Sequence, residues 1–160
     1  MAKSFELASS TSHLLRRAIQ LALDLYEEEL EAGGLTVRQL TVLHAVDQND
    51  EATLTQTKLV ELTSIDRSTL ADIIDRIEKR ELIVRKRVEE DQRANSVKIT
   101  AIGRRALKGA QPAMQRAEIA FLETLPARNR AEFLKSLNLL AQASEDRKKL
   151  NGAKKPRERR

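Results

Sequence analysis

The sequence contains no cysteine and no tryptophan, and three Phe and one Tyr are its full set of aromatic residues. Without cysteine the chain cannot form disulfides, bind zinc through thiolates or sense oxidation through a thiol. Four aromatic side chains offer no stacking platform for the bases of single-stranded nucleic acid. These absences exclude thiol chemistry and disfavour single-strand binding.

The signatures of catalysis are missing as well. The sequence has five Gly and two His, and it contains no phosphate-binding glycine loop, no H-E-x-x-H metal motif and no G-x-S-x-G nucleophile elbow. His13 and His44 are more typical of structural or pocket residues than of catalysts. We therefore expect no enzymatic activity, no cofactor and no metal site.

Membrane segments are not expected either. No run of about 18 apolar residues occurs, and residues 1–6 lack the apolar core of a secretory signal. The chain of 160 residues, 41% hydrophobic and 33% charged, has the composition of one domain able to bury a core. We expect a cytoplasmic protein with no membrane partner.

The stretch from Thr55 to Arg105 is the most informative part of the chain. A short helix, a tight turn, a second helix and a charged β-hairpin are expected to follow one another there without a linker. That order predicts a winged helix-turn-helix, whose second helix enters the major groove of duplex DNA. The predicted fold class is mainly α with a small β-hairpin wing, flanked by N- and C-terminal helices.

The second helix of this unit has a predictable beginning and a predictable buried face. Asp66 is a good N-cap, and Ile65 and Leu70 on either side of it are placed to form a hydrophobic staple. Apolar residues at i, i+3, i+4 and i+7 define the buried face, which consists of Leu70, Ile73, Ile74 and Ile77.

The opposite face of this helix is predicted to meet DNA. At about 100° per residue it presents Ser68, Ala71, Asp72, Asp75, Arg76 and Lys79, with Arg67 and Thr69 beside its first turn. We expect Arg67, Ser68 and Thr69 to read or border bases because they lie near the N-terminus of the helix. Arg76 and Lys79 are placed where phosphates pass.

The acids on this face have two interpretations. A carboxylate that faces DNA is repelled by phosphate unless it accepts a hydrogen bond from a cytosine amino group. Alternatively, Asp72 pairs with Arg76 and Asp75 pairs with Lys79, each four residues apart, which holds the basic side chains in place. We favour the ion pairs.

The hairpin is predicted from strands at residues 82–88 and 96–100. Leu82, Val84 and Val88 alternate with Ile83, Arg85 and Arg87, and the basic residues can line a phosphate track. At the tip, Asp91 and Arg93 are two residues apart, so Asp91 can orient Arg93 for insertion into the minor groove. The equally acceptable alternative is a solvated loop with an ion pair of roughly 0 to 1 kcal/mol.

The net charge of +5 is unevenly distributed. Residues 64–105 hold 11 basic and 8 acidic side chains, a local excess of +3. Residues 147–160 hold eight Lys and Arg against one Glu, so this segment carries +7 and the rest of the chain −2. Its composition predicts a disordered tail, which either keeps the protein soluble or binds DNA phosphates without specificity.

The flanking segments are predicted to be amphipathic helices. The first covers about residues 10–31 and ends at the Gly33-Gly34 pair, and two more follow Thr100, separated at Pro126. Thr100 is a plausible N-cap, with Gly103 in the first turn. The apolar faces of these helices are buried either in an intrachain bundle or in a dimer interface, and periodicity does not separate the two.

Four segments together resemble the signature of the MarR family of bacterial transcriptional regulators. They are Asp66-Arg67-Ser68-Thr69-Leu70, Asp75-Arg76-Ile77-Glu78-Lys79-Arg80, Asp91-Gln92-Arg93 and Ile99-Thr100-Ala101-Ile102-Gly103-Arg104, matching in order and spacing. The resemblance extends over about residues 10–145, including Leu35 to Leu43 as the second helix. It implies a homodimer, a palindromic operator and often a small ligand that weakens DNA binding.

One position departs from the family pattern. The recognition helix usually ends at a glycine, where this chain has Glu81, and glycine enters the left-handed conformation without strain. We expect the helix to end by another route.

The resemblance also implies an effector. Relatives bind aromatic carboxylates, other phenolic compounds or aromatic acyl-CoA thioesters between the dimerisation helices and the DNA-binding lobe. Anions need cations, and the polar, mostly basic groups in the corresponding segments are His13, Arg16, Arg17, Arg38 and His44. Solvated surface charges are the alternative interpretation of each.

These inferences combine into one hypothesis. Residues 1–146 are a MarR-like domain, with a DNA-binding lobe at about 36–103 and dimerisation helices at about 10–31 and 104–146, followed by the tail at 147–160. The function expected is a homodimeric repressor of transcription that binds double-stranded DNA and is released by an anionic aromatic ligand. The alternative is a winged helix that binds other proteins and lacks specific DNA binding.

Overall fold

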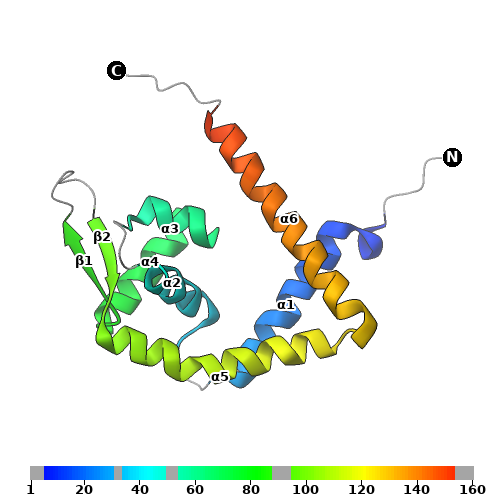
Figure 1. Cartoon of the computed structure of the whole chain (residues 1–160), viewed down its shortest axis with the longest axis horizontal. Coiled ribbons are helices and arrows are strands. Elements are labelled where there is room, and N and C mark those ends of the chain that lie inside the picture. The colour runs from blue at the N-terminus through cyan, green and yellow to red at the C-terminus, as the bar shows by residue number, and fades with distance from the viewer. Residues whose placement is uncertain (1–5, 31–33, 50–53, 88–94, 154–160) are drawn as a thin grey trace. The chain divides into compact units, whose positions relative to one another are not determined.

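The computed structural model describes residues 6–30, 34–49, 54–87 and 95–153 (Figure 1). The chain divides into two compact units, Met1–Ile119 and Ala120–Arg160. The described elements are a short 3-10 helix η1 (Leu7–Ser9), α1 (Thr11–Glu29), α2 (Val37–Asp47), α3 (Gln56–Thr63), α4 (Arg67–Lys79), β1 (Ile83–Arg87), β2 (Asn95–Ile99), α5 (Ala101–Glu123) and α6 (Ala127–Ala153). The fold is mainly helical with one antiparallel hairpin, as predicted.

The core of the first unit lies among α2, α3, α4 and the hairpin. Its fully buried side chains include Leu40 and Leu43 from α2, Leu59 from α3 and Ile74 from α4. Local capping fixes where the surrounding helices begin. Thr36 and Gln39 form a capping box on α2, and the Thr55 side chain accepts a hydrogen bond from the Lys58 N–H on α3.

Helix α4 begins and packs as its sequence predicts. The Asp66 side chain accepts a hydrogen bond from the Thr69 N–H, and Ile65 packs against the core. The four apolar residues Leu70, Ile73, Ile74 and Ile77 are buried. A single face of α4 is therefore fixed by the core, which leaves its opposite face exposed.

Helix α4 ends by the left-handed route, although no glycine is present. Glu81 has φ 57°, the Glu81 N–H donates to the Glu78 carbonyl at 2.8 Å, and the Leu82 N–H donates to the Ile77 carbonyl at 2.9 Å. This pair of bonds is a Schellman motif, with Glu81 at the position that glycine usually takes. The expectation of another route was wrong, because the two hydrogen bonds hold the backbone in that conformation.

Replacing Glu81 with glycine is expected to raise the free energy of unfolding by about 1 kcal/mol, because a side chain in the left-handed region costs about 1 to 2 kcal/mol and glycine does not bear that cost. Urea unfolding measures the change. Glu81→Ala, which keeps a Cβ atom, is the control and should show no comparable gain. Equal stability of the glycine and alanine variants would contradict the strain.

The wing is a two-stranded antiparallel hairpin with Ile83 opposite Ile99 and Arg85 opposite Val97. Ile83 is buried while Val84 is exposed, so the face that contains Ile83 and Arg85 packs inward. The Val97 N–H also donates to the Leu54 carbonyl at 2.9 Å, which ties β2 to the segment before α3. The strands are one residue shifted from their predicted starts and ends, and residues 88–94 lie outside the described residues.

Thr100, which precedes α5, forms hydrogen bonds to the segment that joins α4 to β1. The Thr100 hydroxyl accepts a hydrogen bond from the Gly103 N–H at 2.9 Å, as the predicted N-cap should, and donates to the Glu81 carbonyl at 2.7 Å. The Thr100 N–H donates to the Leu82 carbonyl at 3.0 Å. These bonds connect the start of α5 to the segment between α4 and β1.

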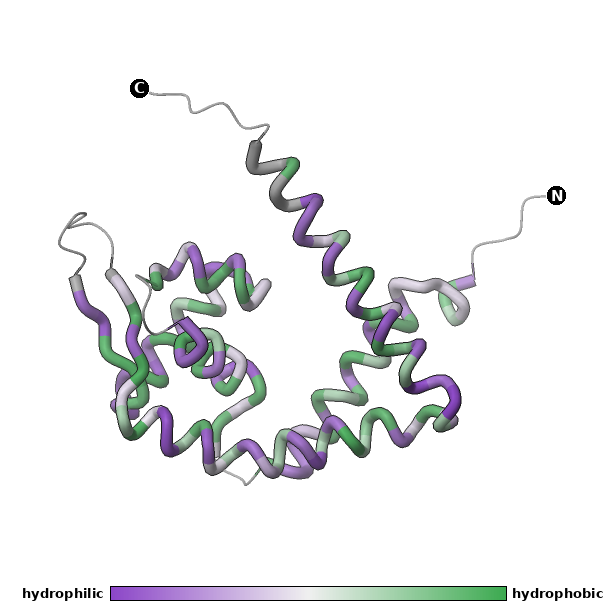
Figure 2. Tube along the Cα trace, in the orientation of Figure 1, coloured by the Kyte–Doolittle hydropathy of each residue, from purple (hydrophilic) through white to green (hydrophobic). Residues whose placement is uncertain are grey.

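The flanking helices carry exposed apolar side chains. Figure 2 shows hydrophobic residues recurring along α1 and α6, and Ile19 on α1 and Leu139 on α6 are 61% and 62% exposed. Within the second unit the rings of Phe121 and Phe133 pack with centroids 6.2 Å apart, across the predicted break at Pro126. None of the described helices is long and apolar enough to cross a membrane.

Two predicted boundaries are corrected. Helix α1 ends at Glu29, where Leu30 turns into an extended conformation before the Gly33-Gly34 pair is reached. Helix α6 continues to Ala153, so the prediction of disorder was wrong for residues 147–153. Arg, Lys and Leu at residues 147–150 favour continuation of the helix, and the helix ends just after Gly152. Residues 154–160 lie outside the described part of the chain.

Candidate nucleic-acid interface

The exposed face of α4 carries the predicted DNA-contacting side chains. Ser68, Arg76 and Lys79 are exposed and Thr69 is half-buried, and they follow one another along the helix away from the core. Arg76 and Lys79 lie in the last turns of α4. Basic side chains at this end of the helix are suited to phosphate contacts. Small hydroxyl groups at the other end allow close approach to bases.

Hydrogen bonds organise the first turn of this face. Asp66 accepts from the Thr69 N–H at 2.9 Å and from the Ser68 hydroxyl at 2.7 Å. These bonds, the one from the Thr69 backbone foremost, hold the pKa of Asp66 well below its ordinary value. Arg67 donates to the Thr57 hydroxyl on α3 at 2.9 Å. The residues predicted to border bases are thus oriented before any DNA is bound.

Arg85 on β1 lies against the acids of α4. Its guanidinium forms an ion pair with Asp75, and its Nε lies 3.2 Å from a carboxylate oxygen of Glu78. The predicted pairing of Asp75 with Lys79 was wrong, since Arg85 comes from the inward face of the strand and occupies the Asp75 carboxylate. Nor does an ion pair join Asp72 to Arg76, both of which the structure describes.

The remaining predicted wing contacts are not tested. Arg87 is the last residue of β1, and Asp91 and Arg93 at the hairpin tip lie outside the described residues. Their roles in phosphate and minor-groove binding stay predictions.

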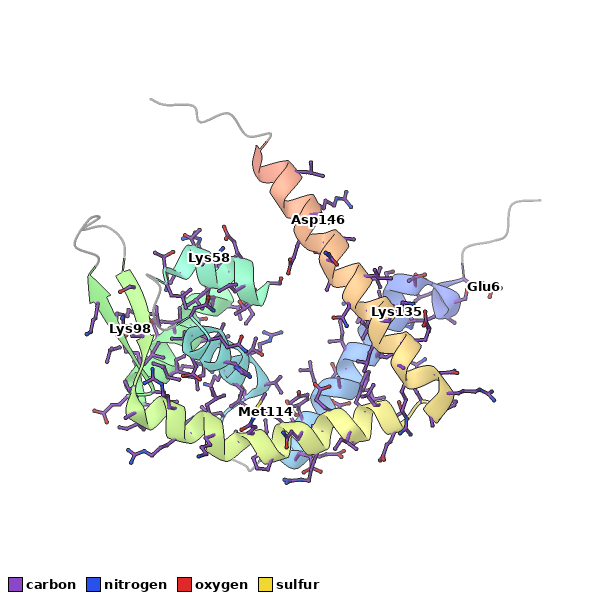
Figure 3. The ribbon with its side chains drawn as sticks, viewed as in Figure 1. Glu6, Lys58, Lys98, Met114, Lys135 and Asp146 are labelled. Atoms are coloured by element: carbon purple, nitrogen blue, oxygen red, sulfur yellow. The ribbon has the colours of Figure 1, made fainter. Side chains whose placement is uncertain are left out.

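A cavity of about 790 Å³ lies between α1, α2 and α5. Helix α5 supplies most of its walls, including Met114, which is labelled in Figure 3. The lining residues are Tyr26, His44, Asp47, Arg104, Leu107, Lys108, Gln111, Met114, Gln115, Glu118 and Ile119. A volume of this size, which combines apolar surface with polar and charged side chains, suits an organic ligand that carries polar groups.

Two polar contacts organise the walls of this cavity. The Tyr26 hydroxyl donates to Glu118 at 2.6 Å, and burial together with the neighbouring carboxylate raises the pKa of that hydroxyl well above its usual value. Arg104 forms an ion pair with Asp47 at 3.0 Å. Lys108 is exposed and forms no ion pair with any residue that the structure describes, so its charge is available to an anion.

The five predicted effector residues are not brought together. His44 lines the large cavity, whereas Arg38 lines a smaller one beside α4. His13, Arg16 and Arg17 lie on α1 and line neither cavity. Tyr26 and Lys108 were missed. Tyr26 follows the apolar period of α1 and is therefore interpreted as a packing residue, and nothing in the sequence singles out one exposed lysine. Within the described residues, no group of three or more His, Asp or Glu could hold a metal ion.

A family model described as the MarR family matches residues 33–94. The chain is 30% identical over 128 residues to the transcriptional regulator HosA of Escherichia coli, covering 80% of this chain and 92% of HosA.

Solved structures of related proteins share the fold. The PcaV transcriptional regulator from Streptomyces coelicolor, in complex with its natural ligand, superposes with a TM-score of 0.76 and 29% identity over 90% of this chain and 99% of PcaV. The transcriptional repressor CouR bound to a 23-mer DNA duplex gives a TM-score of 0.75 and 28% identity, over 88% and 99% of the two chains. CouR from Rhodococcus jostii RHA1 was also solved bound to p-coumaroyl-CoA, with a TM-score of 0.69 and 25% identity over 86% of this chain and 96% of CouR.

Proposed function

Because the chain belongs to the MarR family of transcriptional regulators, we propose that it is a homodimeric repressor that binds a pseudo-palindromic operator and is released by an aromatic acid or an aromatic acyl-CoA thioester. Such a protein represses by occupying a promoter. With two recognition helices related by a dyad, half-site centres lie about one helical turn, ~10 bp, apart.

The exposed face of α4 carries this proposal. It combines hydroxyl groups at its first turn with Arg76 and Lys79 at its end, and none of these groups is needed by the core. Arg67, Ser68 and Thr69 read or border bases, Arg76, Lys79, Arg85 and Arg87 hold phosphates, and Arg93 enters the minor groove with Asp91 behind it. The similarity to a DNA-bound repressor supports these roles.

The dimer is supported by the apolar side chains left exposed on the flanking helices. Leu14, Leu15 and Ile19 on α1, together with Leu139 and Leu140 on α6, are at least 40% exposed. Exposed apolar side chains of this number are usual where a second copy covers them. The two copies are related by a dyad, as in most homodimers.

The large cavity is the proposed effector site. Lys108 supplies a cation for a carboxylate or phosphate group, while Leu107, Met114 and Ile119 offer an apolar surface for an aromatic ring. A structure of CouR holds p-coumaroyl-CoA, and one of PcaV holds its natural ligand, which supports an effector of this class. His44 is the residue of the predicted set that remains in this site.

The position of this cavity suggests how an effector weakens DNA binding. Arg104 in its wall follows Gly103 in the first turn of α5, and Thr100 in that turn donates to the carbonyl of Glu81 at the end of α4. A ligand that binds the DNA-incompetent arrangement more tightly shifts the equilibrium by at most its difference in affinity for the two arrangements.

The test uses duplex fragments selected from genomic DNA with the intact protein. The protein should bind one pseudo-palindromic duplex with a strong salt dependence, and an aromatic acid or its CoA thioester should dissociate the complex. The same ligand should stabilise the free protein by about 2.7 kcal/mol at ~100 times its Kd, because it binds the folded state. Fluorescence anisotropy and thermal unfolding measure the two effects.

Lys108→Ala should blunt the effector response and leave ligand-free DNA binding intact. Lys135 is an exposed lysine on α6, and the control variant Lys135→Ala should respond to the effector as wild type does. A broad panel of aromatic anions that changes neither unfolding nor DNA binding would contradict the effector class. Absence of salt-sensitive duplex binding would contradict the regulator itself and favour a protein-interaction module.

A further inference from the structure

A second, polar cavity lies between the N-terminal turn of α2 and the exposed face of α4. Its volume is about 210 Å³, and its lining residues are Thr36, Arg38, Gln39, Thr69, Asp72, Ile73 and Arg76. Arg38 is the second residue of α2 and is exposed. Arg38 therefore shares a recess with Thr69 and Arg76, two residues of the proposed DNA-binding face.

The charge of Arg38 is not used within the described structure. No ion pair joins it to another described residue. In the capping box the Thr36 hydroxyl accepts from the Gln39 N–H, and the Gln39 side-chain oxygen accepts from the Thr36 N–H. Asp72 is the acid that lines the same recess as Arg38 and Arg76. Two cations and one carboxylate in the recess leave this side of α4 with an excess positive charge.

The side of α4 opposite the recess that contains Arg38 is flanked by α3 and the wing. At about 100° per residue, Arg67 and Arg76 lie about 180° apart around the helix. Arg67 donates to Thr57 of α3, and Arg85 of the wing reaches Asp75 and Glu78. The exposed face of α4 thus lies between α3 and the wing on one side and Arg38 of α2 on the other.

This arrangement has a consequence for a helix in the major groove. The groove is about 12 Å wide and an α-helix with its side chains is about 10 to 12 Å across, so elements that flank the helix meet the phosphates bordering the groove. With α4 in the groove, the wing and α3 would meet one phosphate strand. Arg38 lies, together with Arg76, on the side of α4 that would meet the other.

We propose that Arg38 binds a backbone phosphate of the operator, on the strand opposite the one that meets α3 and the wing. The contact positions α4 in the groove and does not read sequence. The proposal rests on the proposed DNA-binding function, and it separates Arg38 from the effector residues among which sequence reasoning placed it.

The experiment measures operator affinity of the intact protein against salt concentration for wild type, Arg38→Ala and Arg38→Lys. Both copies of the homodimer carry the substitution, so two phosphate contacts are lost, which should weaken binding at least about tenfold at ~0.15 M salt and reduce the magnitude of the salt slope by about 1.8, with base preference unchanged. Arg38→Lys should retain most of the slope because it keeps the charge. Arg128→Ala, which removes an exposed charge from α6, is the matched control and should leave both quantities unchanged.

The outcomes separate the two proposals. If wild type binds the operator and Arg38→Ala has the same affinity and slope, the phosphate contact is overturned while the regulator stands. If Arg38→Ala instead keeps DNA binding and loses its response to an aromatic acid or acyl-CoA, the contact is likewise overturned in favour of an effector role. Failure of wild type to bind any duplex in a salt-dependent way overturns the regulator. Equal thermal unfolding of the variants shows that folding is intact.

Discussion

Replacing Gly103 with alanine should destabilise the folded protein by about 3 kcal/mol, because a side chain at this position has no space. A Cβ atom there would collide with the backbone carbonyl of Leu82 and lie 2.8 Å from Cγ1 of Ile99. The carbonyl cannot move freely, since it also accepts the Thr100 N–H. Chemical unfolding measures the loss, and weaker DNA binding should accompany it because Leu82 joins α4 to the wing.

Gly109→Ala is the matched control on the same helix. Nothing lies within 4 Å of a Cβ atom at Gly109, so alanine there should stabilise the protein by up to about 1 kcal/mol through its higher helix propensity. If the free energy of unfolding falls in Gly103→Ala and rises in Gly109→Ala, close approach at Gly103, and not helix propensity, determines the effect. A Gly103→Ala protein as stable as wild type would refute the close approach.

Arg85→Ala should weaken operator binding about 100-fold, or ~3 kcal/mol, more than the loss of a single phosphate contact. The substitution removes a cation from the DNA-binding surface and also frees the carboxylates of Asp75 and Glu78 to repel phosphate. Fluorescence anisotropy with the operator duplex measures the loss. Lys86→Ala, the next residue on the strand, removes an equal charge without exposing an acid and should cost about tenfold or less.

A double-mutant cycle tests the cause. Neutralising the acids with Asp75→Asn and Glu78→Gln should recover at least about tenfold of the lost affinity in the Arg85→Ala protein and gain less in the wild-type background. Additive effects of the substitutions would show that Arg85 acts on DNA independently of these carboxylates. Thermal unfolding of each variant separates a change in binding from a change in folding.

The sequence by itself determined the helix-turn-helix and the orientation of its second helix. The N-cap at Asp66 and the apolar period from Leu70 to Ile77 are local signals, because capping bonds and helical periodicity involve residues at most a few turns apart. The exposed face with Ser68, Arg76 and Lys79 follows from the same period. The hairpin strands and the N-cap at Thr100 were likewise within reach of local reasoning.

Tertiary structure alone decided which side chains meet across elements. Asp75 had a candidate partner four residues away in Lys79, yet it pairs with Arg85, because strand pairing places Ile83 and Arg85 on the side of β1 that faces α4. Arg38 and His44 lie on the same helix and were grouped by their chemistry. They are six residues apart on α2, and they line different cavities. Contacts of this kind depend on the relative placement of distant segments, which sequence spacing does not report.

The end of the recognition helix shows both contributions in one place. Glu81 carries no local preference for the left-handed conformation, so its sequence indicated another ending. The conformation follows from its surroundings: the Leu82 N–H bonds to Ile77, and the carbonyls of Glu81 and Leu82 both accept from Thr100 at the start of α5. Local signals determined that α4 exists and which face it exposes. The Schellman bonds, together with the long-range hydrogen bonds from Thr100, decided how α4 ends and how it joins the wing, because together they outweigh the cost of one strained residue.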